Sequence, residues 1–163
     1  MKISTKMQDA LNGQVNAELY SAYLYLSMSA YFESQNLGGL AHWLRVQARE
    51  ETGHAMKIYD YVAERGGTVK LAEIKAPPAR WDSPLNAFED AYAHETKVTV
   101  MINDLLKIAH AENDPATAAR LQWFVTEQVE EEATTDDVVQ KLRMIGASKN
   151  GLFMLDAHLG KRE

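Results

Sequence analysis

The chain has 163 residues, of which 46% are apolar and 25% charged, so it can bury one hydrophobic core and is predicted to form a single domain over residues 1–163. Acidic residues outnumber basic ones by 23 to 17, a formal charge of −6 without a basic run, which argues against nucleic acid as a partner and favours cations. There is no cysteine, so disulfides, thiolate metal sites and cysteine nucleophiles are excluded, and any metal must be bound by oxygen and nitrogen.

The sequence carries no sign of export or membrane insertion. The first seven residues lack the apolar stretch of a secretory signal, and no run approaches the ~20 apolar residues of a membrane-spanning helix. We therefore expect a cytoplasmic protein that does not interact with a membrane.

Glycine and proline are few and clustered between long stretches rich in Ala, Leu and Glu, a pattern typical of an all-helical protein. Thr5 with Gln8 fits a capping box, so a first helix is expected over about 6–35. A second helix is expected over about 40–65, where a glycine pair follows.

Two further helices begin at N-cap residues that are followed directly by proline, Ser83 and Asp114. These signals predict helices over about 84–112 and about 115–145. A short apolar segment over about 150–159 is expected to add a fifth, short helix.

The lengths of the links predict the topology. The first and third links hold only a few residues, so each is expected to join an antiparallel hairpin. The middle link, over about 66–83, can cross ~50 Å at ~3.3 Å per extended residue, more than the ~40 Å length of these helices. The second and third helices should therefore run parallel, in an up-down-down-up four-helix bundle with one long crossover.

Each long helix carries an apolar stripe at three- and four-residue spacing, and each stripe is interrupted near its middle by an acid. The four acids are Glu18, Glu51, Glu95 and Glu131. At ~1.5 Å per residue they lie ~18, ~25, ~28 and ~25 Å along the bundle, within about one turn of each other. Because buried carboxylates cost several kcal/mol each unless cations or protons compensate, this layer is expected to bind metal.

His54 lies three residues after Glu51, a spacing that places a carboxylate and an imidazole on one helical face, as in carboxylate-bridged di-iron bundles. Ligands rich in oxygen with little nitrogen suit iron or manganese better than a structural zinc site. A single Glu-x-x-His motif is usually a chance occurrence, and a single acid on an apolar stripe is usually a residue at the edge of that stripe. Four level acids together with the pair are much harder to explain by chance.

The sequence closely resembles the prokaryotic, haem-free ferritins over nearly its whole length. Four stretches carry the match: LNGQVNAELYSAYLYLSMSAYF from Leu11, AHWLRVQAREETGHAMKIYDYVAERGG from Ala41, WDSPLNAFEDAYAHE from Trp81 and LQWFVTEQVEEEA from Leu121. The resemblance implies a ferritin-like bundle that assembles as a homo-oligomer of twenty-four subunits into a hollow iron-storing shell.

The resemblance implies one iron site formed by Glu18, Glu51 and His54. It implies a second site formed by Glu51, Glu95 and Glu131, with Glu51 bridging. The implied activity is that of a ferroxidase: two Fe(II) bind, O2 or peroxide oxidises them to an oxo- or peroxo-bridged Fe(III) pair, and ferric product moves inward to form mineral.

The resemblance also assigns residues around this pair. It places Gln128 beside the second site and Tyr25 close to the di-iron centre, although by itself Tyr25 would be interpreted as core filling. It further indicates a third, weaker iron site toward the inner surface, formed by Glu50, Glu127 and Glu130.

Residues at diagnostic positions distinguish this sequence from two related families. Bacterioferritins have a second Glu-x-x-His on the fourth long helix and a haem-ligating Met directly after the bridging Glu. Here those positions are Gln128-x-x-Glu131 and Thr52, so no haem is expected, and the cysteine cluster of rubrerythrins is absent.

Gly53 costs ~1 kcal/mol of helix propensity relative to Ala, and the sequence explains neither it nor Gly13.

Three functions stay open from the sequence: an iron-oxidising storage cage, another di-metal oxidoreductase such as a peroxide-consuming enzyme, and a metal-free scaffold bundle. A storage cage further predicts that neighbouring subunits cover apolar surface on the long link and on Leu152–Leu159.

Overall fold

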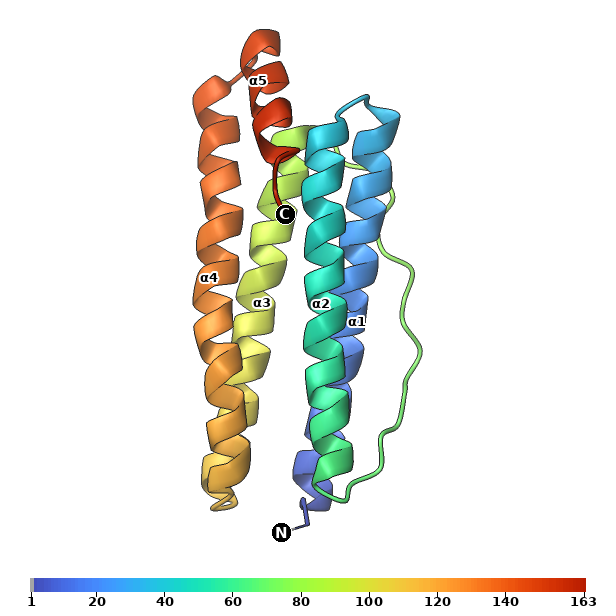
Figure 1. The fold of residues 1–163 in the computed structure, drawn as a ribbon, viewed down its shortest axis with the longest axis vertical. Coiled ribbons are helices and arrows are strands. Elements are labelled where there is room, and N and C mark those ends of the chain that lie inside the picture. The colour runs from blue at the N-terminus through green and yellow to red at the C-terminus, as the bar shows by residue number, and fades with distance from the viewer. Residues whose placement is uncertain (1) are drawn as a thin grey trace.

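The computed structural model describes residues 2–163, and in this part of the chain all regular structure is helical. The helices are α1 (Thr5–Ser34), α2 (Gly38–Glu64), α3 (Pro84–Ala111), α4 (Pro115–Ile145) and α5 (Lys149–Leu159). Figure 1 shows α1 beside α2 and α3 beside α4, with α5 at the upper end. The all-α prediction is confirmed, and every helix boundary lies within two residues of its predicted position.

The chain runs up, down, down and up through the four long helices. α2 ends at the lower end of the bundle, the link over residues 65–83 returns to the upper end, and α3 begins there (Figure 1). The predicted parallel arrangement of α2 and α3 with one long crossover is therefore confirmed. None of the helices in residues 2–163 combines the length and apolarity that crossing a membrane requires.

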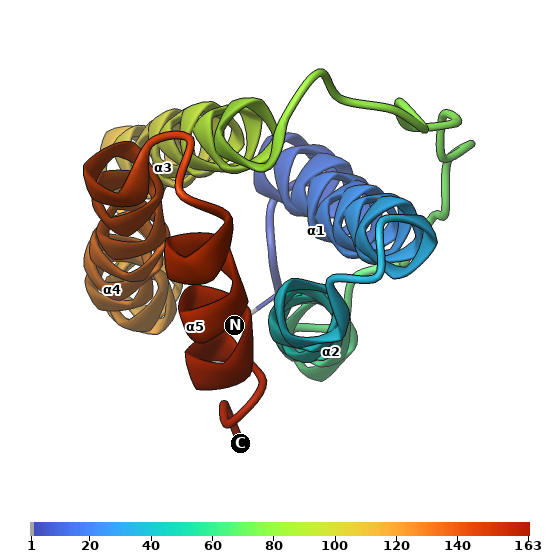
Figure 2. The same cartoon turned by 90° about the horizontal axis from the view of Figure 1, so that it is seen from above.

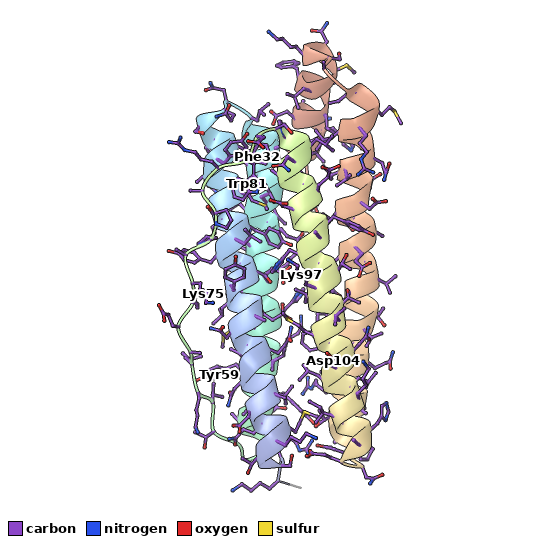
Figure 3. The ribbon with its side chains drawn as sticks, turned by 180° about the vertical axis from the view of Figure 1, so that it is seen from behind. Phe32, Tyr59, Lys75, Trp81, Lys97 and Asp104 are labelled. Carbon is purple, nitrogen blue, oxygen red and sulfur yellow. The ribbon has the colours of Figure 1, made fainter. Side chains whose placement is uncertain are left out.

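Polar residues of α1 hold the long link against the bundle. The Asn12 side chain donates to the Thr68 carbonyl at 3.0 Å and accepts from the Lys70 amide at 3.2 Å. Figure 3 shows the link following α1, with Trp81 near its upper end. There the Trp81 indole donates to Asp90 at 2.9 Å, which anchors the link where α3 begins.

The N-caps of α3 and α4 are the predicted ones. The Ser83 hydroxyl accepts from the Asn86 amide at 3.0 Å, and the Asp114 carboxylate accepts from the Thr117 amide at 3.1 Å. In both helices proline follows the cap, where its missing N–H costs no hydrogen bond.

The predicted capping box at the start of α1 is wrong. Ser4, with extended backbone, is the N-cap residue, and its hydroxyl accepts from the Met7 amide at 3.0 Å. Thr5 is already the first helical residue. Gln8 accepts instead from the Thr68 amide at 2.8 Å, because the link passes close to it.

The start of α2 is capped by a residue far away in the sequence. Its own N-cap residue, Leu37, makes no side-chain cap, and the Asp156 carboxylate of α5 accepts from the Leu40 amide at 2.9 Å. A Cβ atom at Gly39 would lie 1.7 Å from the Asp156 carbonyl oxygen, so only glycine permits this approach. As a result, α5 lies across the end of the bundle between α4 and α2 (Figure 2).

The hydrophobic core is divided into two clusters along the bundle. The upper cluster includes Phe32, Leu44 and Phe88, and the lower one includes Leu11 and Ile58. In each long helix, the acid singled out from the sequence stands between its upper and lower core residues. A polar layer therefore crosses the middle of an otherwise apolar core.

Candidate metal centre

The polar layer contains one acid from each long helix and one histidine. Glu18, Glu51 and Glu95 are each 1% exposed, Glu131 is 5% exposed and His54 is 4% exposed. Each acid belongs to an otherwise apolar stripe, so folding of the helices against each other carries all four carboxylates into the interior. The structure thus brings together the five residues that the sequence indicated as ligands.

These residues form two overlapping groups of ligand atoms. Glu18, Glu51 and His54 each offer an atom within 4.8 Å of the others, and so do Glu51, Glu95 and Glu131. Glu51 belongs to both groups. Because a carboxylate has two oxygen atoms, Glu51 can bridge two neighbouring cations.

Two glutamines, which the sequence reasoning missed, hold the carboxylates. Gln14 Nε2 donates to Glu18 at 2.8 Å, and Gln47 Nε2 donates to Glu51 at 3.0 Å and to Glu131 at 2.5 Å. Both glutamines are buried, and each precedes an acid by four residues. A Gln four residues before the interrupting acid, repeated on two stripes, is the sequence signal that could have identified them.

Glu95 is held by Tyr25 and Gln128, the two residues that the resemblance placed around the di-iron centre. The Tyr25 hydroxyl donates to one carboxylate oxygen of Glu95, and Gln128 Nε2 lies 3.2 Å from the other. These donors are uncharged, so they orient the carboxylate without neutralising it.

The imidazole of His54 is oriented on both sides. Its Nδ1 lies 3.2 Å from Glu51 and its Nε2 lies 3.6 Å from Glu127. The ring also makes edge contacts with Trp123 and Phe124, at centroid distances of 5.4 and 6.2 Å. One ring nitrogen therefore faces the buried carboxylates, while the other faces the half-buried carboxylate of Glu127.

The acids of the expected third site are not gathered in the same way. Glu127 forms a group with His54 and Glu131, but Glu50 and Glu130 belong to none of the three ligand groups found in residues 2–163. Glu50 is instead paired with Arg162 at 2.6 Å. A third metal site at Glu50, Glu127 and Glu130 remains a prediction.

Burial and mutual repulsion disfavour the charged form of the four central acids. Burial, then the charge of Glu51, raises the pKa of Glu18 well above its usual value; burial, then Glu95 and Glu131, does the same for Glu51. Burial also raises the pKa of Glu95, and burial with the charge of Glu95 raises the pKa of Glu131 to about 7. The centre is therefore short of positive charge.

Two observations indicate that the four central acids lack the partners that a cation would supply. Among the described residues, Glu18 Oε2 is the buried side-chain atom left without a hydrogen-bond partner. No Lys or Arg in residues 2–163 forms an ion pair with any of the four central acids. Oxygen ligands with one nitrogen suit divalent iron or manganese, and paired cations would satisfy both the free oxygen and the excess negative charge.

Comparison with known proteins gives a consistent result. The family model described as "Ferritin-like domain" matches residues 8–145. A bacterial non-heme ferritin of Bacteroides fragilis (strain 638R) is 46% identical over 160 residues, covering 98% of this chain and 99% of that protein. One from Staphylococcus aureus (strain MRSA252) is 36% identical, covering 98% of this chain and 96% of its own length.

Solved structures agree with these relatives. A structure of an open pore ferritin from the hyperthermophilic archaeon Archaeoglobus fulgidus matches this chain with a TM-score of 0.98. The two are 56% identical, and the match covers 99% of this chain and 98% of that one. With the bundle, the layer of carboxylates and these matches taken together, the chain belongs to the ferritin family.

Proposed function

We propose that this protein oxidises Fe(II) to Fe(III) at the buried carboxylate centre and stores the ferric product inside a shell built from copies of the chain. The observation that carries this proposal is Glu51, which is shared between two three-ligand groups and forms no ion pair with a Lys or Arg of residues 2–163. Relatives named bacterial non-heme ferritin support iron as the metal.

The paired arrangement suits a two-electron reaction. Each Fe(II) gives one electron, so two ions held side by side deliver the two electrons that convert O2 to peroxide, or peroxide to water, with protons taken up at the oxygen atoms. Glu18 and His54 would hold one substrate ion, Glu95 and Glu131 the other, and Glu51 both. We therefore infer that the ions are oxidised as a pair.

The surrounding residues prepare the centre before iron arrives. Protons held on carboxylic acids of raised pKa must leave when metal binds. Gln14, Gln47, Gln128 and Tyr25 already direct carboxylate oxygens toward fixed positions, which reduces the reorganisation that binding requires.

Storage requires assembly, and the surface of a single chain is compatible with it. Large apolar side chains are exposed near the upper end, with Met144 84%, Phe153 76% and Met154 71% accessible, and Leu71 of the long link is 69% accessible. Apolar surface of this kind is usually covered by a neighbouring subunit. We infer that the cage expected from the resemblance uses the α5 end and the link as contacts.

The test is aerobic loading of metal-free protein with Fe(II), following ferric absorbance and then the iron content of particles separated by size. We expect far more than three irons per chain in a large particle. Glu51→Gln should slow the initial oxidation more than about tenfold, since losing even a partner of a ligand costs 10- to 100-fold. Glu33→Gln, in an exposed ion pair on α1, is the matched control.

Other outcomes separate the alternatives. About two irons per chain on a small oligomer that consumes peroxide would instead identify a discrete di-metal oxidoreductase. Failure to bind Fe(II) in fixed stoichiometry would leave a metal-free scaffold and refute the proposal.

A further inference from the structure

The chain ends beside α2 (Figure 1), and its penultimate residue, Arg162, contacts the support of the metal centre. Arg162 Nη1 donates to Gln47 Oε1 at 2.9 Å, and its Nη2 donates to Glu50 Oε2 at 2.6 Å. The guanidinium carbon lies 4.3 Å from the centroid of the Trp43 ring, and His42 Nε2 lies 2.7 Å from the Arg162 carbonyl oxygen. The tail is therefore held by several independent contacts.

The contact with Gln47 determines which way that amide faces. A guanidinium can only donate hydrogen bonds, so the oxygen of Gln47 must face Arg162. Its NH2 group then faces Glu51 and Glu131, to which it donates. If the amide turned round, its oxygen would oppose two carboxylates, so Arg162 stabilises the only orientation that supports both ligands.

The contact with Glu50 occupies one oxygen of a carboxylate that could otherwise bind metal. Glu50 directly precedes the shared ligand Glu51 in α2, and one of its two carboxylate oxygens, Oε2, accepts from the guanidinium. The Arg162 side chain is 20% exposed and that of Glu50 is 42% exposed. Water therefore reaches the pair, and a cation that binds Glu50 Oε2 would have to displace Arg162.

We propose that Arg162 is a positioning residue of the metal centre. It orients Gln47 toward Glu51 and Glu131, and it withholds Glu50 from metal until the guanidinium moves away. This inference rests on the proposed metal site, but not on the oxidation of iron.

The first experiment titrates metal-free protein with Zn(II) by calorimetry, since zinc reports the number and affinity of the sites without redox chemistry. We expect two zinc ions per chain in the wild type. Arg162→Gln should weaken their binding about tenfold, the lower end of the effect of removing a partner of a ligand, and Arg162→Lys should restore part of the affinity. The matched control is Arg143→Gln, which breaks an exposed ion pair with Glu89 near the same end of the bundle.

The same titration tests the role of Glu50. Arg162→Gln should gain a further, weaker zinc ion per chain, and adding Glu50→Gln should abolish it. The proposal is overturned if Arg162→Gln binds zinc like the wild type, or if no additional zinc that depends on Glu50 appears.

A second readout follows the guanidinium itself. Phenylglyoxal modifies accessible arginines, and peptide mass spectrometry gives the rate at each position. In the metal-free wild type, Arg162 should react more slowly than the exposed Arg143. Glu50→Gln, or zinc beyond two ions per chain, should accelerate modification of Arg162 only. Equal rates at Arg162 in the wild type and Glu50→Gln would overturn the proposal.

These results are separable from the proposed function. A protein that shows the expected zinc and modification behaviour but does not oxidise Fe(II) would refute only the ferroxidase proposal. Normal iron oxidation and storage with an unchanged zinc isotherm in Arg162→Gln would refute only the role of Arg162.

Discussion

At the scale of single residues, the centre is built from acids supported by neutral donors. Gln14, Gln47, Gln128 and Tyr25 donate to carboxylates that carry no ion pair with Lys or Arg within residues 2–163. Such donors orient oxygen atoms but leave their negative charge available to a cation. The cost is that, without metal, protons must neutralise these carboxylates.

This cost predicts how the stability of the metal-free protein depends on pH. The pKa of Glu131 is raised from 4.5 to about 7, and burial also raises those of Glu18, Glu51 and Glu95. Between the unfolded and folded pKa values the folded state binds more protons, so the free energy of unfolding falls as pH rises. Urea unfolding of metal-free protein should show lower stability at pH 8 than at pH 5.

Glu131→Gln provides the control for this effect, because it removes one of the groups that titrates in the folded state. Its stability should depend less on pH between 5 and 7 than that of the wild type. A wild-type free energy of unfolding that rises from pH 5 to pH 8 would contradict the expectation.

At the scale of the elements, α2 carries both the shared ligand and two glycines of opposite character. A Cβ atom at Gly53 would meet nothing within 4 Å, whereas one at Gly39 would collide with the α5 backbone. One glycine is required by packing and the other is not.

Replacing the unconstrained glycines should stabilise the helices. Gly53→Ala, and likewise Gly13→Ala in α1, where a Cβ atom would also meet nothing, should each raise the free energy of unfolding by about 1 kcal/mol through helix propensity. Chemical denaturation measures this directly. Destabilisation at either position would show that its glycine has a role beyond the contacts of the single chain.

The constrained glycine should respond in the opposite way. Gly39→Ala should displace α5 and lower the free energy of unfolding by about 1–3 kcal/mol, as overpacking does. Hydrogen exchange should then be faster in α5 and at the start of α2, which loses its Asp156 cap. The neighbouring Gly38→Ala is the matched control, because a Cβ atom there meets nothing within 4 Å, and an equal loss in both variants would contradict the explanation.

At the scale of the whole molecule, part of the exposed apolar surface lies where assembly was expected. Phe153 and Met154 of α5 are 76% and 71% exposed and lie outside the two core clusters. Their exposure contributes nothing to the stability of the isolated bundle, so we infer that it is maintained for contacts between copies.

Charging this surface should separate assembly from metal binding. Phe153→Glu together with Met154→Glu should reduce the particle to smaller oligomers, because charges would be buried without partners at the contact. Light scattering coupled to size exclusion measures the mass, and zinc calorimetry should still find two ions per chain. A particle of unchanged mass would show that α5 does not mediate assembly.

The sequence by itself determined the helices and the level of the acids. These features depend on residues within a few positions of each other, so they can be predicted without knowing the tertiary structure. They are the helix periodicity, the caps at Ser83 and Asp114, and the apolar stripes. The spacing of Glu51 and His54 belongs to the same class. A link too long for a tight turn was enough to predict the crossover.

Only the tertiary structure decided which distant residues support those local features. Asp156 caps α2, Gln8 accepts a hydrogen bond from the long link rather than capping its own helix, and Arg162 orients Gln47. Each contact joins elements remote in sequence, and its partner is selected by how the helices pack. A polar side chain has many possible partners in the sequence, but close packing leaves it only the few within hydrogen-bond reach.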